Sequence, residues 1–266
     1  MGERIVITSG KGGVGKTTTS ANLGATLASL GKKVVIVDGD IGLRNLDIVL
    51  GMESRIVFDL IDVVEGRVNC EKALIKDRRI PNLFVLPASQ TKDKDAIKPN
   101  QMEEVIETLA KTHDFVLIDC PAGIEQGFKN AIAGAKKAIV VVTPEVSSVR
   151  DADRVIGLLE ANNITDIKLL VNRLRLDMVS KGEMLDIQDV TDILREELIG
   201  VVPDNSEIVI STNKGEPVIL QQKSKSGSCY KRIAQRLCGE KVDIPTFEEH
   251  HTFMNKMKTL FGGNTK

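Results

Sequence analysis

The stretch SGKGGVGKTTTS, residues 9–20, decides the fold, because it joins an apolar run (RIVITS, 4–9) to a helix-like pattern. It fits two phosphate-binding patterns at once. The spacing G-x-G-x-x-G over 10–15 is typical of dinucleotide-binding folds, whereas G-x-x-x-x-G-K-T over 10–17 is typical of the P-loop of nucleoside triphosphatases. The stretch also contains Lys11, which neither pattern requires.

The composition favours a globular protein that works inside the cell. The chain has 266 residues, enough for one large α/β domain or two small ones, and its 36 basic and 37 acidic residues nearly cancel. This balance provides no overall field that favours nucleic acid, although a local basic patch stays open. The four scattered cysteines and the lack of a signal peptide or an 18-residue apolar run predict a soluble cytoplasmic protein.

Short, apolar, β-branched runs alternate with stretches of helical period. The runs lie at 4–9, 33–38, 83–88, 115–119, 138–143, 167–172 and 199–204. The clearest helical stretches lie at 17–31, 99–112 and 148–163. Near-continuous apolar strands are typical of a parallel sheet that is covered on both faces. The pattern therefore predicts an α/β fold with a doubly wound, mostly parallel sheet flanked by helices, which binds ligands at the carboxyl ends of its strands.

The residues after the loop distinguish the two phosphate-binding patterns. A dinucleotide fold would use Asp38, at the end of the second run, to bind a ribose, but it would leave Lys16, Thr17 and Asp119 without a role. A P-loop uses all three, because Lys16 reaches the phosphates, Thr17 binds Mg²⁺ and an acid after a later strand helps to hold the metal. We therefore interpret residues 10–17 as a P-loop.

The motif KGGVGKTT (11–18) resembles the deviant Walker A motif of the ParA/MinD class of P-loop ATPases. The resemblance covers nearly the whole chain and is most specific for the MinD branch, which places bacterial division sites. Further matching segments are DGDIGLRNLD (38–47), LPASQTKDKDA (86–96), DCPAGIE (119–125), PEVSSVRDADR (144–154), NR (172–173), GEPV (215–218) and LFGG (260–263).

The resemblance implies an activity and partners. It implies an ATPase that uses ATP and Mg²⁺, forms a homodimer when ATP is bound, and cycles between the cytoplasm and the cytoplasmic face of the membrane. It also implies recruitment of a MinC-type division inhibitor and stimulation by a MinE-type or other topological factor. The alternative is a ParA-type partition ATPase that binds DNA without sequence specificity, for which we would expect a basic patch and no membrane-binding tail.

The resemblance also assigns roles to individual residues. It implies a nucleotide site made of Gly10, Lys11, Gly12, Gly13, Val14, Gly15, Lys16, Thr17, Thr18, Glu145, Asn172, Arg173, Pro203 and Asp204. The implied metal site is Thr17, Asp38 and Asp119, and the implied catalytic residues are Lys11, Lys16, Asp40 and Asn45. Lys11 would cross a dimer interface to the partner's phosphates, while Asp40, helped by Asn45, would position the attacking water.

Several of these residues also have simpler interpretations. Asp38 and Asp40 fit ordinary turn chemistry at the end of a strand, and Lys11 fits a solvated loop lysine. Asn172 fits a common strand terminator. Ser148-x-x-Asp151 fits a capping box that opens a helix, which we prefer, and its surface stays open as one that binds partners.

The C-terminal residues predict a separate membrane-binding element. We divide the chain into an ATPase domain (1–239), a linker (240–250), an amphipathic helix (251–263) and a tail (264–266). Apolar residues recur at helical spacing with lysines beside them: Phe253, Met254, Lys256, Met257, Lys258, Leu260 and Phe261. A polar linker containing proline favours an interfacial membrane helix over a helix packed on the protein's own core.

Overall fold

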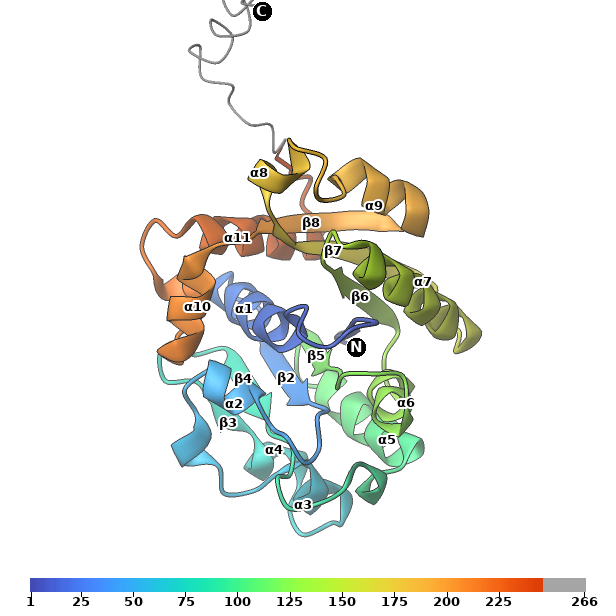
Figure 1. Cartoon of the computed structure of the whole chain (residues 1–266). Helices are drawn as coiled ribbons and strands as arrows, with labels where there is room; N and C mark the ends of the chain where they lie inside the picture. The colour runs from blue at the N-terminus through green and yellow to red at the C-terminus, as the bar shows by residue number, and fades with distance from the viewer. Residues whose placement is uncertain (246–266) are drawn as a thin grey trace, which may run out of the picture.

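The computed structural model describes residues 1–245, so the predicted membrane helix, the tail and residues 246–250 of the predicted linker lie outside the described residues. The described chain forms one eight-stranded sheet (Figure 1). Its strands are β1 (Glu3–Thr8), β2 (Val34–Asp38), β3 (Ile75–Lys76), β4 (Leu83–Leu86), β5 (Phe115–Asp119), β6 (Lys137–Val142), β7 (Asp166–Leu174) and β8 (Glu197–Pro203). The spatial order is β3-β4-β2-β5-β1-β6-β7-β8, and only the β3–β4 pairing is antiparallel.

The α-helices cover both faces of this sheet. They are α1 (Lys16–Ser29), α2 (Leu46–Val49), α3 (Leu60–Val64), α4 (Cys70–Ala73), α5 (Pro99–Ala110), α6 (Gln126–Ala133), α7 (Val146–Ala161), α8 (Leu176–Val179), α9 (Ile187–Leu194), α10 (Ser206–Asn213) and α11 (Lys225–Leu237). Three 3-10 turns complete the elements, η1 (Glu53–Arg55), η2 (Lys94–Ala96) and η3 (Val218–Leu220). Figure 1 shows α1 with α11 on one face and α5, α6 and α7 on the other.

Alternation along the strands divides the core into two layers. In β1, Ile5 and Ile7 pack into the cluster under α1 and α11, whereas Val6 between them packs into the cluster under α5, α6 and α7. Neighbouring side chains of a strand point to opposite faces, so a strand buried on both faces must be apolar throughout. The predicted doubly wound parallel sheet is therefore confirmed.

The strand order reverses direction at β1. The strands β2 to β5 all lie on one side of β1, and the strands β6 to β8 all lie on the other side. A crevice opens at such a switch point, outside the carboxyl ends of the strands. The loop of residues 9–15 follows β1 directly and so lies at this crevice.

The start of α7 differs from the prediction. The helix begins at Val146 with Glu145 as its N-cap, and no side chain caps it. Ser148 therefore lies inside the first turn, where its buried hydroxyl accepts a hydrogen bond from the backbone amide of Thr143 at 3.1 Å. The predicted capping box between Ser148 and Asp151 is wrong, because the helix starts two residues before the serine.

The first part of the predicted linker lies against the domain. The Arg236 guanidinium, near the end of α11, donates to the carbonyl oxygens of Val242, Asp243 and Ile199 at 2.6, 2.6 and 2.8 Å. Ile244 packs against the core cluster that includes Val201 of β8. Residues 240–245 are therefore held at the edge of the sheet. No helix within residues 1–245 is both long enough and apolar enough to cross a membrane.

Candidate nucleotide-binding site

The phosphate loop lies in close contact with β7 on one side and with α7 on the other. Gly15 has a φ of 101°, which favours glycine, and a Cβ there would lie 2.4 Å from Nδ2 of Asn172. A Cβ on Gly10 would lie 2.2 Å from the backbone of Asp151 in α7. Glycine is therefore needed at these two positions for contact with neighbouring elements as well as for the turn itself.

The two lysines of the loop point to different places. Lys16, at the start of α1, is only 7% exposed and its Nζ donates to the hydroxyl of Ser9 at 3.0 Å. The Nζ of Lys11 lies at the surface, 3.3 Å from a carboxylate oxygen of Glu145 and 3.2 Å from the hydroxyl of Ser147. Lys16 thus lies within the loop, whereas Lys11 extends over the first turn of α7.

The other predicted loop residues surround Lys16. Gly12 and Gly13 are exposed, Thr17 and Thr18 are half-buried, and Val14 is buried. The loop therefore exposes its glycine backbone to solvent. Backbone amides in such a loop, at the N-terminus of a 14-residue helix, are suited to binding phosphate.

Two buried carboxylates face each other beside the loop. Asp38 and Asp119 are register partners at the ends of β2 and β5, and each is 1% exposed. Burial raises the pKa of Asp119 to about 6, although hydrogen bonds from Ser20 and Thr17 lower it. Burial, followed by the charge of Asp119, also holds the pKa of Asp38 well above its usual range.

This donor set fits a hard divalent cation. The hydroxyl of Ser20 donates to Asp119 at 2.7 Å, and the backbone amide of Asp40 donates to Asp38 at 2.9 Å, so both carboxylates are held in place. Neither burial nor mutual repulsion favours two charges here, and a cation would offset both. Carboxylate and hydroxyl oxygens are ligands that Mg²⁺ accepts, usually together with substrate phosphates.

The segment after β2 carries the two predicted water-positioning residues. Asp40 is half-buried close to the carboxylates, whereas Asn45 is exposed at the N-terminus of α2 and makes no capping bond there. Asp38 also accepts a 3.4 Å bond from the amide of Leu46, so one buried carboxylate holds both ends of the segment. The structure therefore brings Asp40 to the site and leaves Asn45 at its margin.

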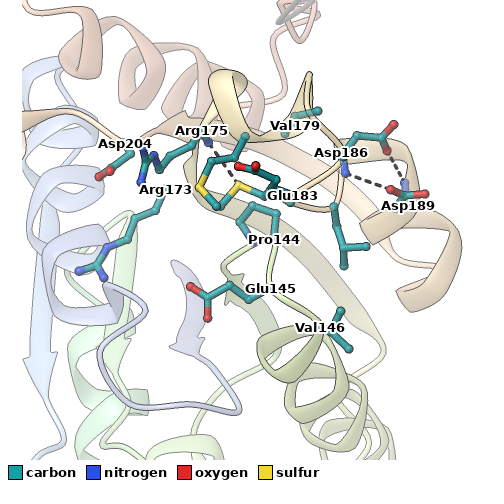
Figure 2. Close-up of a pocket in the computed structure, with 14 residues that line it drawn as sticks. Pro144, Glu145, Val146, Arg173, Arg175, Val179, Glu183, Asp186, Asp189 and Asp204 are labelled. Atoms are coloured by element: carbon teal, nitrogen blue, oxygen red, sulfur yellow. Dashed lines mark hydrogen bonds between the residues drawn. The ribbon is translucent and has the colours of Figure 1, made fainter.

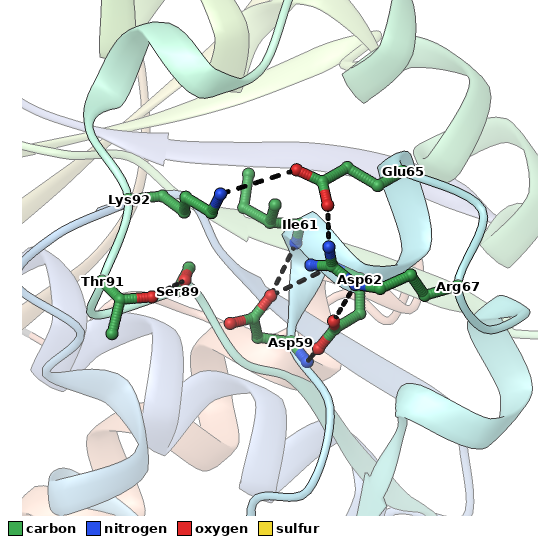
Figure 3. A network of polar contacts seen from close by, with 8 residues as sticks. All are labelled: Asp59, Ile61, Asp62, Glu65, Arg67, Ser89, Thr91 and Lys92. Atoms are coloured by element: carbon green, nitrogen blue, oxygen red, sulfur yellow. Dashed lines mark hydrogen bonds and ion pairs between the residues drawn. The ribbon is translucent and has the colours of Figure 1, made fainter.

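Sequence reasoning did not find a polar network that supports this segment (Figure 3). The amide of Gly42 donates to the carbonyl oxygen of Ser89 at 2.8 Å. In the same loop, Lys92 pairs with Glu65, which also pairs with Arg67 beyond α3. The segment after β2 is thus connected to α3 through residues 89–92.

Asn172, near the end of β7, contacts the phosphate loop directly. Its Nδ2 donates to the carbonyl oxygen of Val14 at 2.7 Å, while its buried Oδ1 has no hydrogen-bond partner within residues 1–245. An orphaned buried oxygen suits an amino donor such as the one on a purine base. Arg173, Pro203 and Asp204 follow at the same ends of β7 and β8, where Arg173 has a φ of 57° and is exposed.

A groove of about 870 Å³ opens beside the phosphate loop rather than over it (Figure 2). Three predicted nucleotide-binding residues line it, Glu145, Arg173 and Asp204. The remaining lining residues are Pro144, Val146, Arg175, Met178, Val179, Gly182, Glu183, Met184, Leu185, Asp186 and Asp189. Sequence reasoning missed the part from 175 to 189, because a segment of short helix and turn has no clear periodicity.

Known proteins share both this sequence and this fold. Residues 2–164 match the family described as AAA domain. The septum site-determining protein MinD of Synechocystis sp. is 54% identical over 268 residues, covering 99% of this chain and 100% of that protein.

Two solved structures are similar over most of the chain. The MinC:MinD cell division protein complex of Aquifex aeolicus matches with a TM-score of 0.86 and 49% identity, over 93% of this chain and 100% of that one. MinD of Pyrococcus horikoshii in complex with Mg-ADP matches with a TM-score of 0.81 and 32% identity, over 89% and 96%. A P-loop fold shared over nearly the whole chain, with close to half of the residues identical, places this chain in the MinD family of septum-site-determining ATPases.

Proposed function

We propose that this chain is an ATP-dependent switch that dimerises, binds the cytoplasmic face of the cell membrane through residues 251–263 and recruits a MinC-type division inhibitor there. Membership of the MinD family and the similarity to the Aquifex aeolicus MinC:MinD complex support this proposal. The observation that carries it is the different placement of the two loop lysines, since Lys16 is buried in the loop and Lys11 is not.

The chain's own residues account for nucleotide binding. The backbone amides of the loop and Lys16 hold the phosphates, and Asn172 offers its free oxygen to the base. Thr17, Asp119 and Asp38 would hold Mg²⁺, whose charge would offset the burial and repulsion that raise the pKa values of the two carboxylates. Bound Mg²⁺ supplies positive charge against the phosphate oxygens.

Lys11 makes hydrolysis depend on a second protomer. Its ion pair with Glu145 is at the surface, where such pairs contribute about 1 kcal/mol or less, so it breaks at little cost. A released Lys11 can place its charge on the phosphates bound by the partner, as a cation supplied in trans does. Glu145 is then free to approach the partner's nucleotide, while Asp40 and Asn45 position the attacking water.

Membrane binding through one tail is marginal. Burial of five large apolar side chains contributes roughly 8–10 kcal/mol, and ordering about ten residues costs a similar amount. Lys256 and Lys258 add about 1 kcal/mol each near anionic lipid. A dimer carries two tails, which bind the membrane together with avidity. ATP-driven dimerisation therefore raises the membrane affinity, and hydrolysis lowers it again. A MinE-type or other topological factor would set the rate of that reversal.

The test is co-sedimentation with anionic phospholipid vesicles, in ATP and in ADP. The full chain is compared with a chain that ends at Pro245, since Val242 and Asp243 bind Arg236 and are kept. The matched full-length control is Leu260→Glu. We expect binding in ATP only, and only with the intact tail. Sedimentation of the ATP form with DNA and not with vesicles would support a ParA-type partition ATPase instead.

A further inference from the structure

Arg79 connects three segments that lie far apart in the sequence. Its guanidinium donates to the carbonyl oxygen of Leu50, at the C-terminal end of α2, at 2.5 Å, and to that of Gly215, after α10, at 2.7 Å. It also forms an ion pair of 2.8 Å with Asp77, the residue after β3. Arg79 is none of the site residues expected from the sequence, so the function described above leaves these contacts unexplained.

A buried carboxylate fixes the direction of this guanidinium. Asp77 is 3% exposed and accepts hydrogen bonds from the backbone amides of Arg79 and Ile80 at 2.6 and 3.0 Å. Burial raises the pKa of Asp77, but hydrogen bonds from Arg79 and from these amides lower it by more, so the net shift is downward. Asp77 is therefore ionised at neutral pH and holds the planar fork of donors that Arg79 presents to the two carbonyl groups.

The two segments that Arg79 joins are in direct backbone contact. A Cβ on Gly51 would lie 2.8 Å from the carbonyl oxygen of Gly215, and a Cβ on Gly215 would lie 2.7 Å from the Cα of Gly51. Their φ values of 62° and 63° also favour glycine. Neither glycine has a side chain to hold this contact, and Arg79 donates a hydrogen bond to each segment beside it.

The segment after α10 is itself bound to the helix of the phosphate loop. The Oδ1 of Asn22, in α1, accepts a hydrogen bond from the backbone amide of Val218 at 2.8 Å, and both residues are buried. The Nδ2 of Asn22 donates to the carbonyl oxygen of Thr18, in the first turn of α1, at 2.8 Å. Arg79 therefore ties the end of α2 to a segment that is fixed relative to the phosphate loop.

The other end of α2 carries the expected water-positioning residues. Asp38 accepts hydrogen bonds from the amides of Asp40 and Leu46, and Asn45 is the N-cap of α2. The helix has only four residues, and the amide of Leu50 donates to the carbonyl oxygen of Leu46 at 3.1 Å. A displacement of Leu50 therefore reaches Leu46 and Asn45 within a single helical turn.

We infer that Arg79 is a positioning residue for hydrolysis, which fixes α2 and thereby aligns Asp40 and Asn45 with the attacking water. The inference rests on the proposed function, in which these two residues position that water. Asp38 and the carbonyl oxygen of Ser89 hold the start of the segment after β2, and Arg79 holds its end. Release of that end misplaces the segment, and a misplacement of about 1 Å can lower a rate about 100-fold.

The kinetic test compares Arg79→Ala with Arg236→Ala, without lipid. Arg236 is the matched control, because its guanidinium also donates to backbone carbonyl oxygens, among them that of Ile199 near the start of β8, away from the phosphate loop. We expect Arg79→Ala to lower kcat about 10–100-fold with ATP affinity within about threefold, and Arg236→Ala to keep kcat within about twofold. Arg79→Lys keeps the charge and should recover part of the rate. Equal losses of kcat in the two alanine variants overturn the inference, because general destabilisation then explains both.

Hydrogen–deuterium exchange with Mg-ADP measures the segment itself. Residues 39–50 should exchange faster in Arg79→Ala than in the unchanged chain, and at the unchanged rate in Arg236→Ala. Unchanged exchange of 39–50 in Arg79→Ala overturns the inference even if kcat falls or dimerisation is lost. Hydrolysis at the wild-type rate by Asp40→Ala would instead overturn the water-positioning role in the proposed function, and faster exchange in Arg79→Ala would still show that Arg79 fixes the segment.

Discussion

At the scale of single residues, the buried carboxyl of Asp119 costs the fold stability when it is ionised. It is buried at the end of β5, and its folded-state pKa of about 6 exceeds its ordinary value of 3.8. The folded chain therefore holds the proton more tightly than the unfolded chain does. As the pH rises from about 4 to about 6, stability is lost, and above pH 6 the full penalty remains, on the order of 1–3 kcal/mol. A bound cation would remove this penalty.

We predict that Asp119→Asn raises the free energy of unfolding at pH 7 in EDTA by about 1–3 kcal/mol, because the amide carries no charge to bury. The gain should shrink as the pH falls below 6, and Mg²⁺-dependent nucleotide binding should be lost. Urea unfolding at pH 7 and pH 5 measures the first effect. Asp204→Asn, at an exposed position, should show no gain. Destabilisation by Asp119→Asn at pH 7 would contradict the assignment of burial as the dominant cause.

At the scale of elements, α7 holds the phosphate loop from one side. Asp151 of α7 lies so close to Gly10 that a Cβ would not fit on Gly10. The hydroxyl of Ser148, in the first turn of α7, accepts a hydrogen bond from the amide of Thr143, the residue after β6. The groove begins at the same turn, with Glu145 and Val146. A change in the position of α7 therefore reaches the loop, the Lys11 ion pair and the groove together.

We predict that Ser148→Ala destabilises the fold by about 1–3 kcal/mol, since it leaves the buried amide of Thr143 without a partner. Asp151→Ala keeps the Cβ that faces Gly10 and should change the stability by less than about 0.5 kcal/mol. Chemical denaturation of the two variants measures both effects. Equal losses would mean that Asp151 contributes to the start of the helix, which the structure does not indicate.

At the scale of the whole molecule, the site has one buried lysine and one at the surface. Within one protomer, Lys16 donates to Ser9 inside the loop, whereas Lys11 pairs with Glu145, away from the loop. In the proposed function, the complete set of charges therefore requires two protomers. In the proposed function, dimerisation and hydrolysis are linked through the surface that carries Lys11.

We predict that Lys11→Ala leaves the nucleotide affinity of the monomer within about threefold, because only a surface ion pair is lost. ATP-dependent dimerisation should disappear, and hydrolysis should fall on the order of 10³-fold, as for other cations supplied in trans. Light scattering and phosphate release measure these effects. Lys16→Ala is the contrasting variant and should lose nucleotide binding itself. A Lys11→Ala protein that pairs normally in ATP would refute the role in trans.

The sequence alone determined the strand–loop–helix unit around residues 9–20 and the parallel sheet. Both follow from local spacing: glycines next to Lys16 and Thr17 demand a phosphate loop, and apolar runs such as FVLID (115–119) demand burial on both faces. The start of α7 was placed wrongly, because Ser148 and Asp151 match a local capping pattern, whereas the Ser148 hydroxyl accepts a hydrogen bond from the amide of Thr143, just after β6. The two-residue β3 is too short for any pattern to indicate.

Only the tertiary structure decided which distant residues meet. Asp38 lies beside Asp119 because β2 and β5 pair in register, and Asn172 reaches Val14 because β7 ends beside the loop. The groove and the Arg236 contacts arise in the same way, from segments that meet across the edge of the sheet. Strand order and register depend on the packing of the whole core, so they cannot be predicted from the local periodicity of the sequence.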